Sequence, residues 1–137
     1  MRILGIDYGT KRIGIAVSDP AGIMAHPLKV LEVRPDDSHL LEIQAIARSY
    51  GVEKIVVGLP YNMDGTEGPK AREACLWGER VAELTGLPVV FWDERLSSFE
   101  AEELLAGHEV SPKRMRKLVD KIAAGIILQG YLDSQKT

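Results

Sequence analysis

The sequence predicts an α/β fold built on a mixed five-stranded sheet, with helices on both faces. Two observations carry this prediction. Three short apolar runs, at 3–8, 13–18 and 24–33, are joined by tight turns, and strands joined so closely pair as antiparallel neighbours. Helical periodicity then alternates with short, continuously apolar runs, which is typical of parallel strands connected by helices.

The first three runs have the features of an antiparallel meander. In the second run, Ile13, Ile15 and Val17 alternate with small residues, a period of two that is typical of strands. The connecting segments, at 9–12 and 19–22, each contain a glycine, which favours a tight turn. We therefore expect these strands to pair in chain order.

The middle of the chain alternates between helices and buried strands. Apolar residues recur at helical spacing over 40–50, and Gly51 ends that helix. Continuous apolar runs of strand length follow at 54–59 and 87–92, with a helix over about 69–85 between them. Right-handed crossovers would place both strands parallel to the first one.

Two capping signals predict the last helices. Ser97 and Glu100 have the spacing of a capping box, which predicts a short helix after the last strand. Ser111 followed by Pro112 is typical of an N-cap and a first helical position. We expect the final helix to run from there to about residue 131.

The chain has the size and composition of one globular domain, which we expect to span 1–137. Of its 137 residues, 45% are hydrophobic and 27% are charged. No apolar run approaches the roughly 20 residues that cross a bilayer, and Gly5 and Asp7 interrupt the pattern of a signal peptide. The single cysteine, Cys75, excludes an internal disulfide. We therefore expect a cytoplasmic protein with no membrane partner.

The net charge of −3 argues against a protein that coats nucleic acid by bulk charge, because such proteins are usually strongly basic. A nucleic-acid partner would need a local basic patch, or metal ions held by acidic side chains. The charge is compatible with a nuclease that engages its substrate briefly.

Acidic side chains follow two of the predicted strands. Asp7 ends the first strand, and Asp93 and Glu94 end the strand that begins near residue 87. If these strands are parallel, the carboxylates lie at the carboxyl end of the sheet, where open α/β sheets place their sites. Strand parity puts Asp93 with Val89 and Glu94 with Val90. Only one of the pair can share the face of Asp7, and parity in the sequence leaves both possible.

Asp120 is the third acidic candidate. It shares one stripe of the last helix with Ala124, Ile127 and Tyr131, so its side chain should face the body of the protein. Carboxylates that converge from distant parts of a chain bind hard divalent cations such as Mg²⁺ or Mn²⁺. Two such ions about 4 Å apart can activate water and stabilise an in-line phosphodiester displacement.

Each acid also has a structural interpretation. Asp7 could cap its own turn by accepting backbone hydrogen bonds. Asp93 or Glu94 could pair with Arg95 or cap the next helix. Asp120 could form a surface ion pair with Arg116, one helical turn earlier.

Basic residues flank the acidic candidates and could hold a phosphate backbone beside them. Some lie in the turn after Asp7, and others surround Asp120 on the last helix, where a solvated helix face is the alternative interpretation. The loop at 62–68 could present backbone amides to a phosphate or be an ordinary connector. The cations that we expect to contact nucleic acid are Lys11, Arg12, Arg95, Lys113, Arg114, Arg116 and Lys117.

Four segments resemble the YqgF family, also called RuvX, within the RNase H-like superfamily. They are Gly5–Gly14, Gly58–Gly65, Asp93–Ser97 and Asp120–Leu128, and they span nearly the whole chain in the family's order. The resemblance implies an RNase H-like fold and a nuclease that uses Mg²⁺ or Mn²⁺.

The resemblance also assigns roles to the acidic residues. It implies catalytic acids at Asp7, at the Asp93–Glu94 pair and at Asp120, all of them candidate metal ligands. Within the pair we favour Glu94 as the catalytic member, because superfamily members commonly use an acid at a strand end.

The family resemblance favours a bacterial enzyme that trims the 5′ end of the precursor of 16S ribosomal RNA. Resolution of four-way DNA junctions is the alternative activity, and a noncatalytic ribosome-assembly or nucleic-acid-binding factor is the alternative class. The segment 5–10 is also similar to the phosphate loop of actin- and sugar-kinase-type ATPases, but those proteins need two such domains. We expect a structured RNA as partner, with DNA and a homodimer left open.

Overall fold

The computed structural model describes residues 1–60, 68–93 and 111–135. In chain order the elements are β1 (Ile3–Asp7), β2 (Arg12–Ser18), β3 (Ala25–Glu32), α1 (Ser38–Ser49), β4 (Lys54–Leu59), α2 (Pro69–Thr85), β5 (Val89–Asp93) and α4 (Pro112–Ser134). Each begins and ends within three residues of the bounds that the sequence predicts. The short helix predicted after Ser97 lies outside the described residues.

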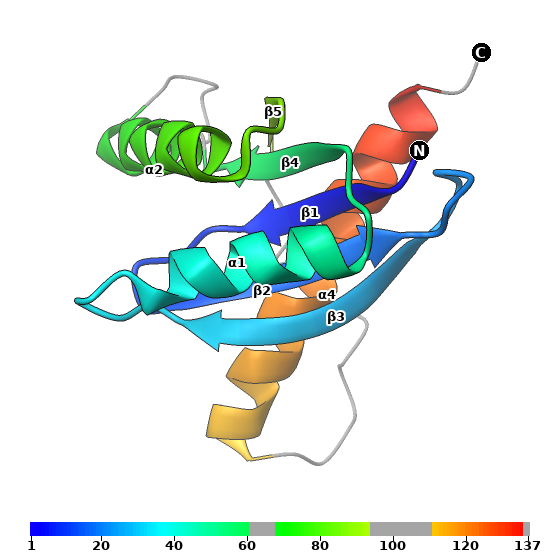
Figure 1. Cartoon of the computed structure of the whole chain (residues 1–137). Helices are drawn as coiled ribbons and strands as arrows, with labels where there is room; N and C mark the ends of the chain where they lie inside the picture. The colour runs from blue at the N-terminus through cyan, green and yellow to red at the C-terminus, as the bar shows by residue number, and fades with distance from the viewer. Residues whose placement is uncertain (61–67, 94–110, 136–137) are drawn as a thin grey trace.

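The strands form one five-stranded sheet in the order β3-β2-β1-β4-β5 (Figure 1). β1, β2 and β3 pair in antiparallel fashion, whereas β4 and β5 run parallel to β1. The predicted mixed sheet, a meander followed by parallel strands, is therefore confirmed. The carboxyl ends of β1, β4 and β5 lie at the same end of the molecule.

Helices cover both faces of this sheet, as the sequence predicts. In Figure 1, α1 lies in front of the strands and α4 crosses behind them. The face towards α1 and α2 buries Leu4 and Ile6 of β1 in one apolar layer with Trp77 of α2. The face towards α4 buries Ile3 of β1 against Leu128 of the helix. Two apolar layers, one on each face, thus hold the sheet in place.

Two glycines let α4 lie unusually close to the sheet. A Cβ on Gly14 of β2 would overlap the backbone carbonyl of Asp120, and one on Gly5 of β1 would lie 2.6 Å from the Cβ of Leu128. Because any larger residue would push the helix away, the distance between α4 and these two strands is set by the absence of side chains. The site depends on this close approach.

Local signals explain where the helices begin and end. The side chain of Ser111 accepts a hydrogen bond from the backbone N–H of Arg114 at 3.2 Å, so the predicted N-cap of α4 is confirmed. The α2 helix ends at Thr85 and is capped by Gly86, whose φ of 70° is a left-handed conformation that favours glycine.

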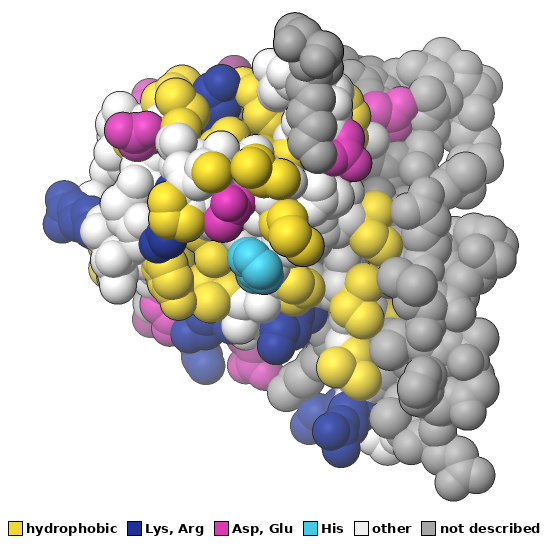
Figure 2. Space-filling model, turned by 90° about the vertical axis from the view of Figure 1, so that its right-hand side faces the viewer, with side chains coloured by type: hydrophobic (Ala, Val, Ile, Leu, Met, Phe, Trp, Pro, Cys, Tyr) yellow, Lys and Arg dark blue, Asp and Glu magenta, His cyan; other side chains and the backbone are white. Residues whose placement is uncertain are grey.

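The amino end of β1 forms the opposite end of the molecule. Exposed hydrophobic side chains gather there among charged ones (Figure 2), and Met1, Ile23 and Met24 are each more than half exposed. The N-terminal ammonium of Met1 donates to the carbonyl of Pro20 at 2.8 Å, which ties the terminus to the β2–β3 connection. No helix of the described residues is long and apolar enough to span a membrane.

Candidate active site

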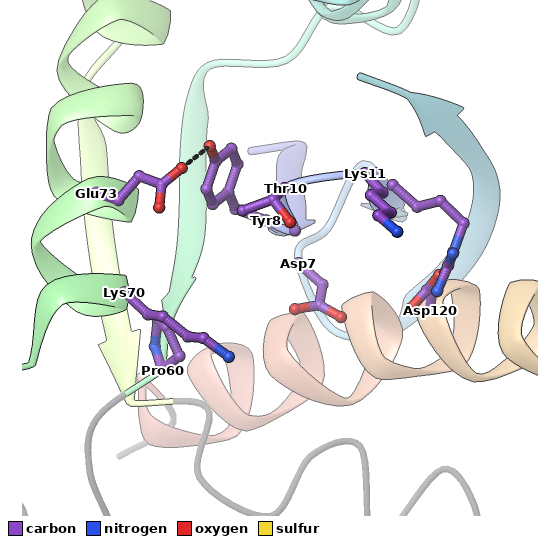
Figure 3. Close-up of a pocket in the computed structure, with 10 residues that line it drawn as sticks. Asp7, Tyr8, Thr10, Lys11, Pro60, Lys70, Glu73 and Asp120 are labelled. Carbon is purple, nitrogen blue, oxygen red and sulfur yellow. Dashed lines mark hydrogen bonds and ion pairs between the residues drawn. The ribbon is translucent and has the colours of Figure 1, made fainter. Parts of the chain in front are cut away.

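A polar cleft of about 360 Å³ lies at the carboxyl ends of β1 and β4. Its walls come from the turn at 7–12, from Pro60 after β4, from Lys70 and Glu73 of α2, and from Asp120 of α4 (Figure 3). Three acidic and three basic side chains therefore face one small volume. This is the edge at which the sequence predicts the site.

The register of the sheet brings Asp7 close to α4. Asp7 shares the face of Ile3 and Gly5, which contacts α4, and it pairs with Gly14 of β2. Opposed residues of antiparallel strands have Cα atoms only about 4.5–5.5 Å apart. Since Gly14 in turn lies directly against the backbone of Asp120, the two acids converge. Figure 3 shows the Asp7 carboxylate pointing towards α4.

Asp120 enters the cleft from the buried stripe of α4. Ala124 and Ile127, on the same stripe, are at most 1% exposed, so the predicted inward orientation of this stripe is confirmed. The carboxylate of Asp120 accepts a hydrogen bond from Nε of Arg12 at 2.5 Å, and the pair is only partly exposed. The ion pair considered for Asp120 was with Arg116, whose side chain lies outside the described part of the structure.

The two faces of β5 separate the members of the acidic pair. Val89 and Phe91 pack in the layer of α1 and α2, whereas Val90 packs in the layer of α4. Asp93 has the parity of Val89 and Phe91, so it lies on the face opposite Asp7. Glu94 lies outside the described residues, as does Arg95.

The other predicted cations divide into two groups. Lys11 and Arg12 line the cleft beside Asp7, as the turn sequence predicts. Lys113 and Arg114 are exposed on the first turn of α4. The side chains of the remaining two, Arg116 and Lys117, are not among those that the structure describes.

Sequence reasoning missed the wall of the cleft that α2 forms. Lys70, at the second residue of this helix, extends its side chain into the cleft (Figure 3). The hydroxyl of Tyr8 donates to the carboxylate of Glu73 at 3.1 Å. Burial, and then the hydrogen bond and the negative charge of Glu73, raise the pKa of Tyr8 to about 12. The available signal was that α2 begins shortly after the carboxyl end of β4, the edge that carries the site.

The donor set of the cleft suits a hard divalent cation. Asp7 and Asp120 offer carboxylate oxygens, which Mg²⁺ and Mn²⁺ prefer over nitrogen or sulfur. Within the described residues, no three His, Cys, Asp or Glu side chains are grouped closely enough to hold a metal ion. Glu94, the predicted third carboxylate, is outside that part of the chain.

Sequence comparison relates the whole chain to one family. The model of the RuvX family, described as "Holliday junction resolvase", matches residues 1–134. A protein of Symbiobacterium thermophilum named "Putative pre-16S rRNA nuclease" is 50% identical over 98% of this chain and 94% of its own length. One of the same name from Geobacillus kaustophilus is 47% identical over 99% of this chain and 100% of its own length.

Structural comparison relates the fold to that of junction resolvases. RuvC of Thermus thermophilus, solved with a Holliday junction substrate, matches with a TM-score of 0.59 and 16% identity over 98% of this chain and 96% of its own. The Fowlpox virus resolvase, solved with junction DNA, matches with a TM-score of 0.59 and 11% identity over the full length of both chains. At these identities the comparison establishes an RNase H-like fold, as predicted.

Proposed function

Because this chain belongs to the RuvX family, as its motifs predict, we propose that it is a nuclease that hydrolyses phosphodiester bonds with the help of bound divalent metal ions. The observation that carries the proposal is the convergence of Asp7 and Asp120 in a cleft that also holds Lys11 and Lys70. Carboxylates that can hold a metal, beside cations that can hold phosphate, are the parts that phosphodiester hydrolysis requires.

Asp7, Asp120 and Glu94 would hold the metal, with Mg²⁺ or Mn²⁺ as the ion. The choice of Glu94 is supported by β5, because its neighbour Asp93 has the parity of the opposite face. A bound ion of this kind lowers the pKa of a coordinated water and stabilises charge that develops on phosphate oxygens.

The cations of the cleft would position the substrate. Lys11 lies on the wall formed by the β1–β2 turn, and Lys70 lies on the opposite wall, with Asp7 between them (Figure 3). Two positive charges on either side of the acids can hold successive phosphates, which places one phosphodiester over the carboxylates. Lys113 and Arg114, exposed on the first turn of α4, would extend the contact along the backbone of the nucleic acid.

The proposed substrate is the 5′ end of the precursor of 16S ribosomal RNA. This choice rests on the name carried by relatives that are 47–50% identical over nearly the whole chain. A four-way DNA junction is the second candidate, because the family description names a Holliday junction resolvase.

A cleavage assay on defined substrates tests the proposal. An RNA that carries the 5′ leader of 16S RNA and a synthetic four-way DNA junction are incubated with the protein at increasing Mg²⁺ or Mn²⁺. We expect Asp7→Asn to lower the rate of RNA cleavage by at least about a hundredfold, because the metal loses a charged ligand. Faster cleavage of the junction than of the RNA would transfer the proposal to the second substrate.

A matched pair of variants on α4 separates the site from general charge effects. Asp120→Asn should reduce cleavage to a similar extent as Asp7→Asn. Asp133→Asn, on the same helix but exposed and hydrogen-bonded to Gln129 at 3.0 Å, should cleave like the wild type. Undiminished cleavage by both the Asp7 and the Asp120 variant would show that these two carboxylates have no part in the reaction.

A further inference from the structure

The ion pair between Arg12 and Asp120 has a consequence for metal binding. We propose that Arg12 competes with the divalent metal ion for the Asp120 carboxylate, and that a substrate phosphate ends this competition by binding the Arg12 guanidinium. The inference rests on the proposed function, because it requires a metal at Asp7 and Asp120. It makes Arg12 a positioning residue that couples substrate binding to metal binding.

The Arg12 guanidinium and a divalent metal ion would both bind the carboxylate of Asp120. Nε of Arg12 lies 2.5 Å from Oδ2 of Asp120, so this oxygen is already engaged by a cation. A metal ion that binds the same carboxylate would have to displace this hydrogen bond, and it would be repelled by the positive charge of the guanidinium. Electrostatic repulsion between like charges is stronger where water is partly excluded. The side chain of Asp120 is only 21% exposed, so this repulsion is weakly screened at the site.

The second step is that Arg12 has a better partner when substrate is present. The ion pair uses Nε, and the described residues supply no other hydrogen-bond or ion-pair partner to the guanidinium. The planar fork of an arginine matches two oxygens of a phosphate, which makes charge-assisted pairs of high geometric specificity. Arg12 lines the same cleft as Lys11 and Lys70, so a phosphate held by these lysines would lie close to the Arg12 side chain.

The third step is reciprocity. If a phosphate draws Arg12 from Asp120, nucleic acid must strengthen metal binding, and metal must strengthen nucleic-acid binding by the same factor. The cleft would then be assembled fully only when both are present. Removing the Arg12 charge should therefore strengthen metal binding and abolish the coupling.

Calorimetric titration with Mn²⁺ tests this directly, without reference to cleavage. We expect Arg12→Gln to bind Mn²⁺ about tenfold more tightly than the wild type in the absence of nucleic acid. A saturating RNA oligonucleotide with 2′-O-methyl and phosphorothioate groups, its integrity checked afterwards, should tighten Mn²⁺ binding of the wild type by about the same factor. The same RNA should change Mn²⁺ binding by Arg12→Gln less than about twofold.

Two further variants keep the test specific. Arg12→Lys keeps the positive charge and should bind Mn²⁺ with nearly the affinity of the wild type. Arg48→Gln removes an exposed arginine in the last turn of α1 that does not line the cleft, so it reports the effect of net charge and should also leave Mn²⁺ affinity nearly unchanged. Circular dichroism verifies that each variant is folded.

The possible failures are distinguishable. Unchanged or weaker Mn²⁺ binding by folded Arg12→Gln would overturn the competition, while Mn²⁺ binding by the wild type would leave the proposed metal site in place. Equal tightening by RNA in the wild type and in Arg12→Gln would overturn the coupling. Absence of Mn²⁺ binding both by the wild type with RNA and by Arg12→Gln would overturn the inference and the metal site together.

Discussion

The two faces of the sheet differ most clearly at the end of β1, where neighbouring residues enter different environments. Asp7 points towards α4 and the polar cleft (Figure 3). Tyr8 packs in the opposite layer, with its ring 4.7 Å from that of Trp77, and its hydroxyl donates to Glu73 of α2. One side of the chain thus supplies chemistry, and the other anchors the same turn to the core.

The packing of the two faces differs in the same way. Towards α4, the inner strands present small residues, Gly5, Gly14 and Ala16, so the helix backbone lies nearly against the strands. Towards α1 and α2, the strands present large side chains such as Ile13 and Ile15, which fill a thicker layer. Close backbone packing fixes the position of Asp120, whereas a layer of side chains can adjust to small changes.

The largest expected difference in stability is between two glycine-to-alanine substitutions, one in the layer of α4 and one in the layer of α2. Gly14→Ala would drive a Cβ into the backbone of Asp120, which cannot rotate away, so α4 must shift. Gly78→Ala in α2 would meet the Phe91 ring at 2.6 Å, and this side chain can move. In urea unfolding we expect Gly14→Ala to lose about 3 kcal/mol or more of unfolding free energy, and Gly78→Ala about 1–2 kcal/mol.

Cleavage assays on the same two variants sharpen the contrast. Gly14→Ala should lose activity even at temperatures where it is folded, because Asp120 moves with the helix. Gly78→Ala should keep nearly all of its activity. Equal losses of stability and activity in the two variants would contradict the idea that the α4 face alone sets the geometry of the site.

A smaller effect is expected at Lys70, through which the α2 layer reaches the cleft. Lys70→Gln should raise KM about three- to tenfold with little change in kcat, because a lysine that holds a phosphate contributes mainly to binding. It should also reduce the dependence of RNA binding on salt by about one phosphate contact. Steady-state kinetics at several salt concentrations measure both quantities.

Arg72→Gln is the matched control for Lys70. Arg72 is exposed on the same helix, two residues after Lys70, but it does not line the cleft. It should leave KM within about twofold of the wild type. Similar effects of both substitutions would mean that α2 acts through its general charge and that Lys70 holds no particular phosphate.

The difference between the faces also explains what the sequence could predict. Period-two alternation at Ile13–Ser18 and the stripe of Asp120 and Ala124 depend on local geometry, so strands, helices and the inward-facing acid were predictable. Parity on β5 could separate Asp93 from Glu94 only after the register of the sheet showed which face Asp7 shares.

Contacts between distant segments were beyond local reasoning. The structural alternative for Asp120 was a partner four residues away on its own helix, but the described pair is with Arg12 of β2, because Gly14 allows α4 to lie against that strand. The α2 wall was missed for a similar reason. Lys70 and Glu73 have ordinary helical surroundings in the sequence, and only the crossover from β4 brings them to the cleft.

The smallest effect should come from the hydrogen bond that anchors Tyr8. Burial and the hydrogen bond to Glu73 raise the pKa of Tyr8 from its ordinary value of 10.0 to about 12, so folding favours the protonated phenol. Its contribution to stability is therefore complete below pH 10, falls as the pH rises from 10 to about 12, and is lost above that range. Tyr8→Phe should cost about 1 kcal/mol or less at neutral pH, because the partly exposed group is screened by solvent.

Unfolding of the wild type and of Tyr8→Phe across alkaline pH measures this effect as a difference, which cancels the titration of the other tyrosines and lysines. The gap between the two proteins should be constant up to about pH 10 and close towards pH 12. The absorbance difference of phenolate between them should place the Tyr8 transition above that of an exposed tyrosine. Cleavage near neutral pH should be nearly unchanged in Tyr8→Phe, since the ring that lines the cleft is kept and the lost hydroxyl donates to Glu73, not to Asp7 (Figure 3). A large loss of activity with intact stability would instead place Tyr8 among the groups that contact substrate. It would contradict the view that Asp7 serves the reaction while Tyr8 only anchors the turn.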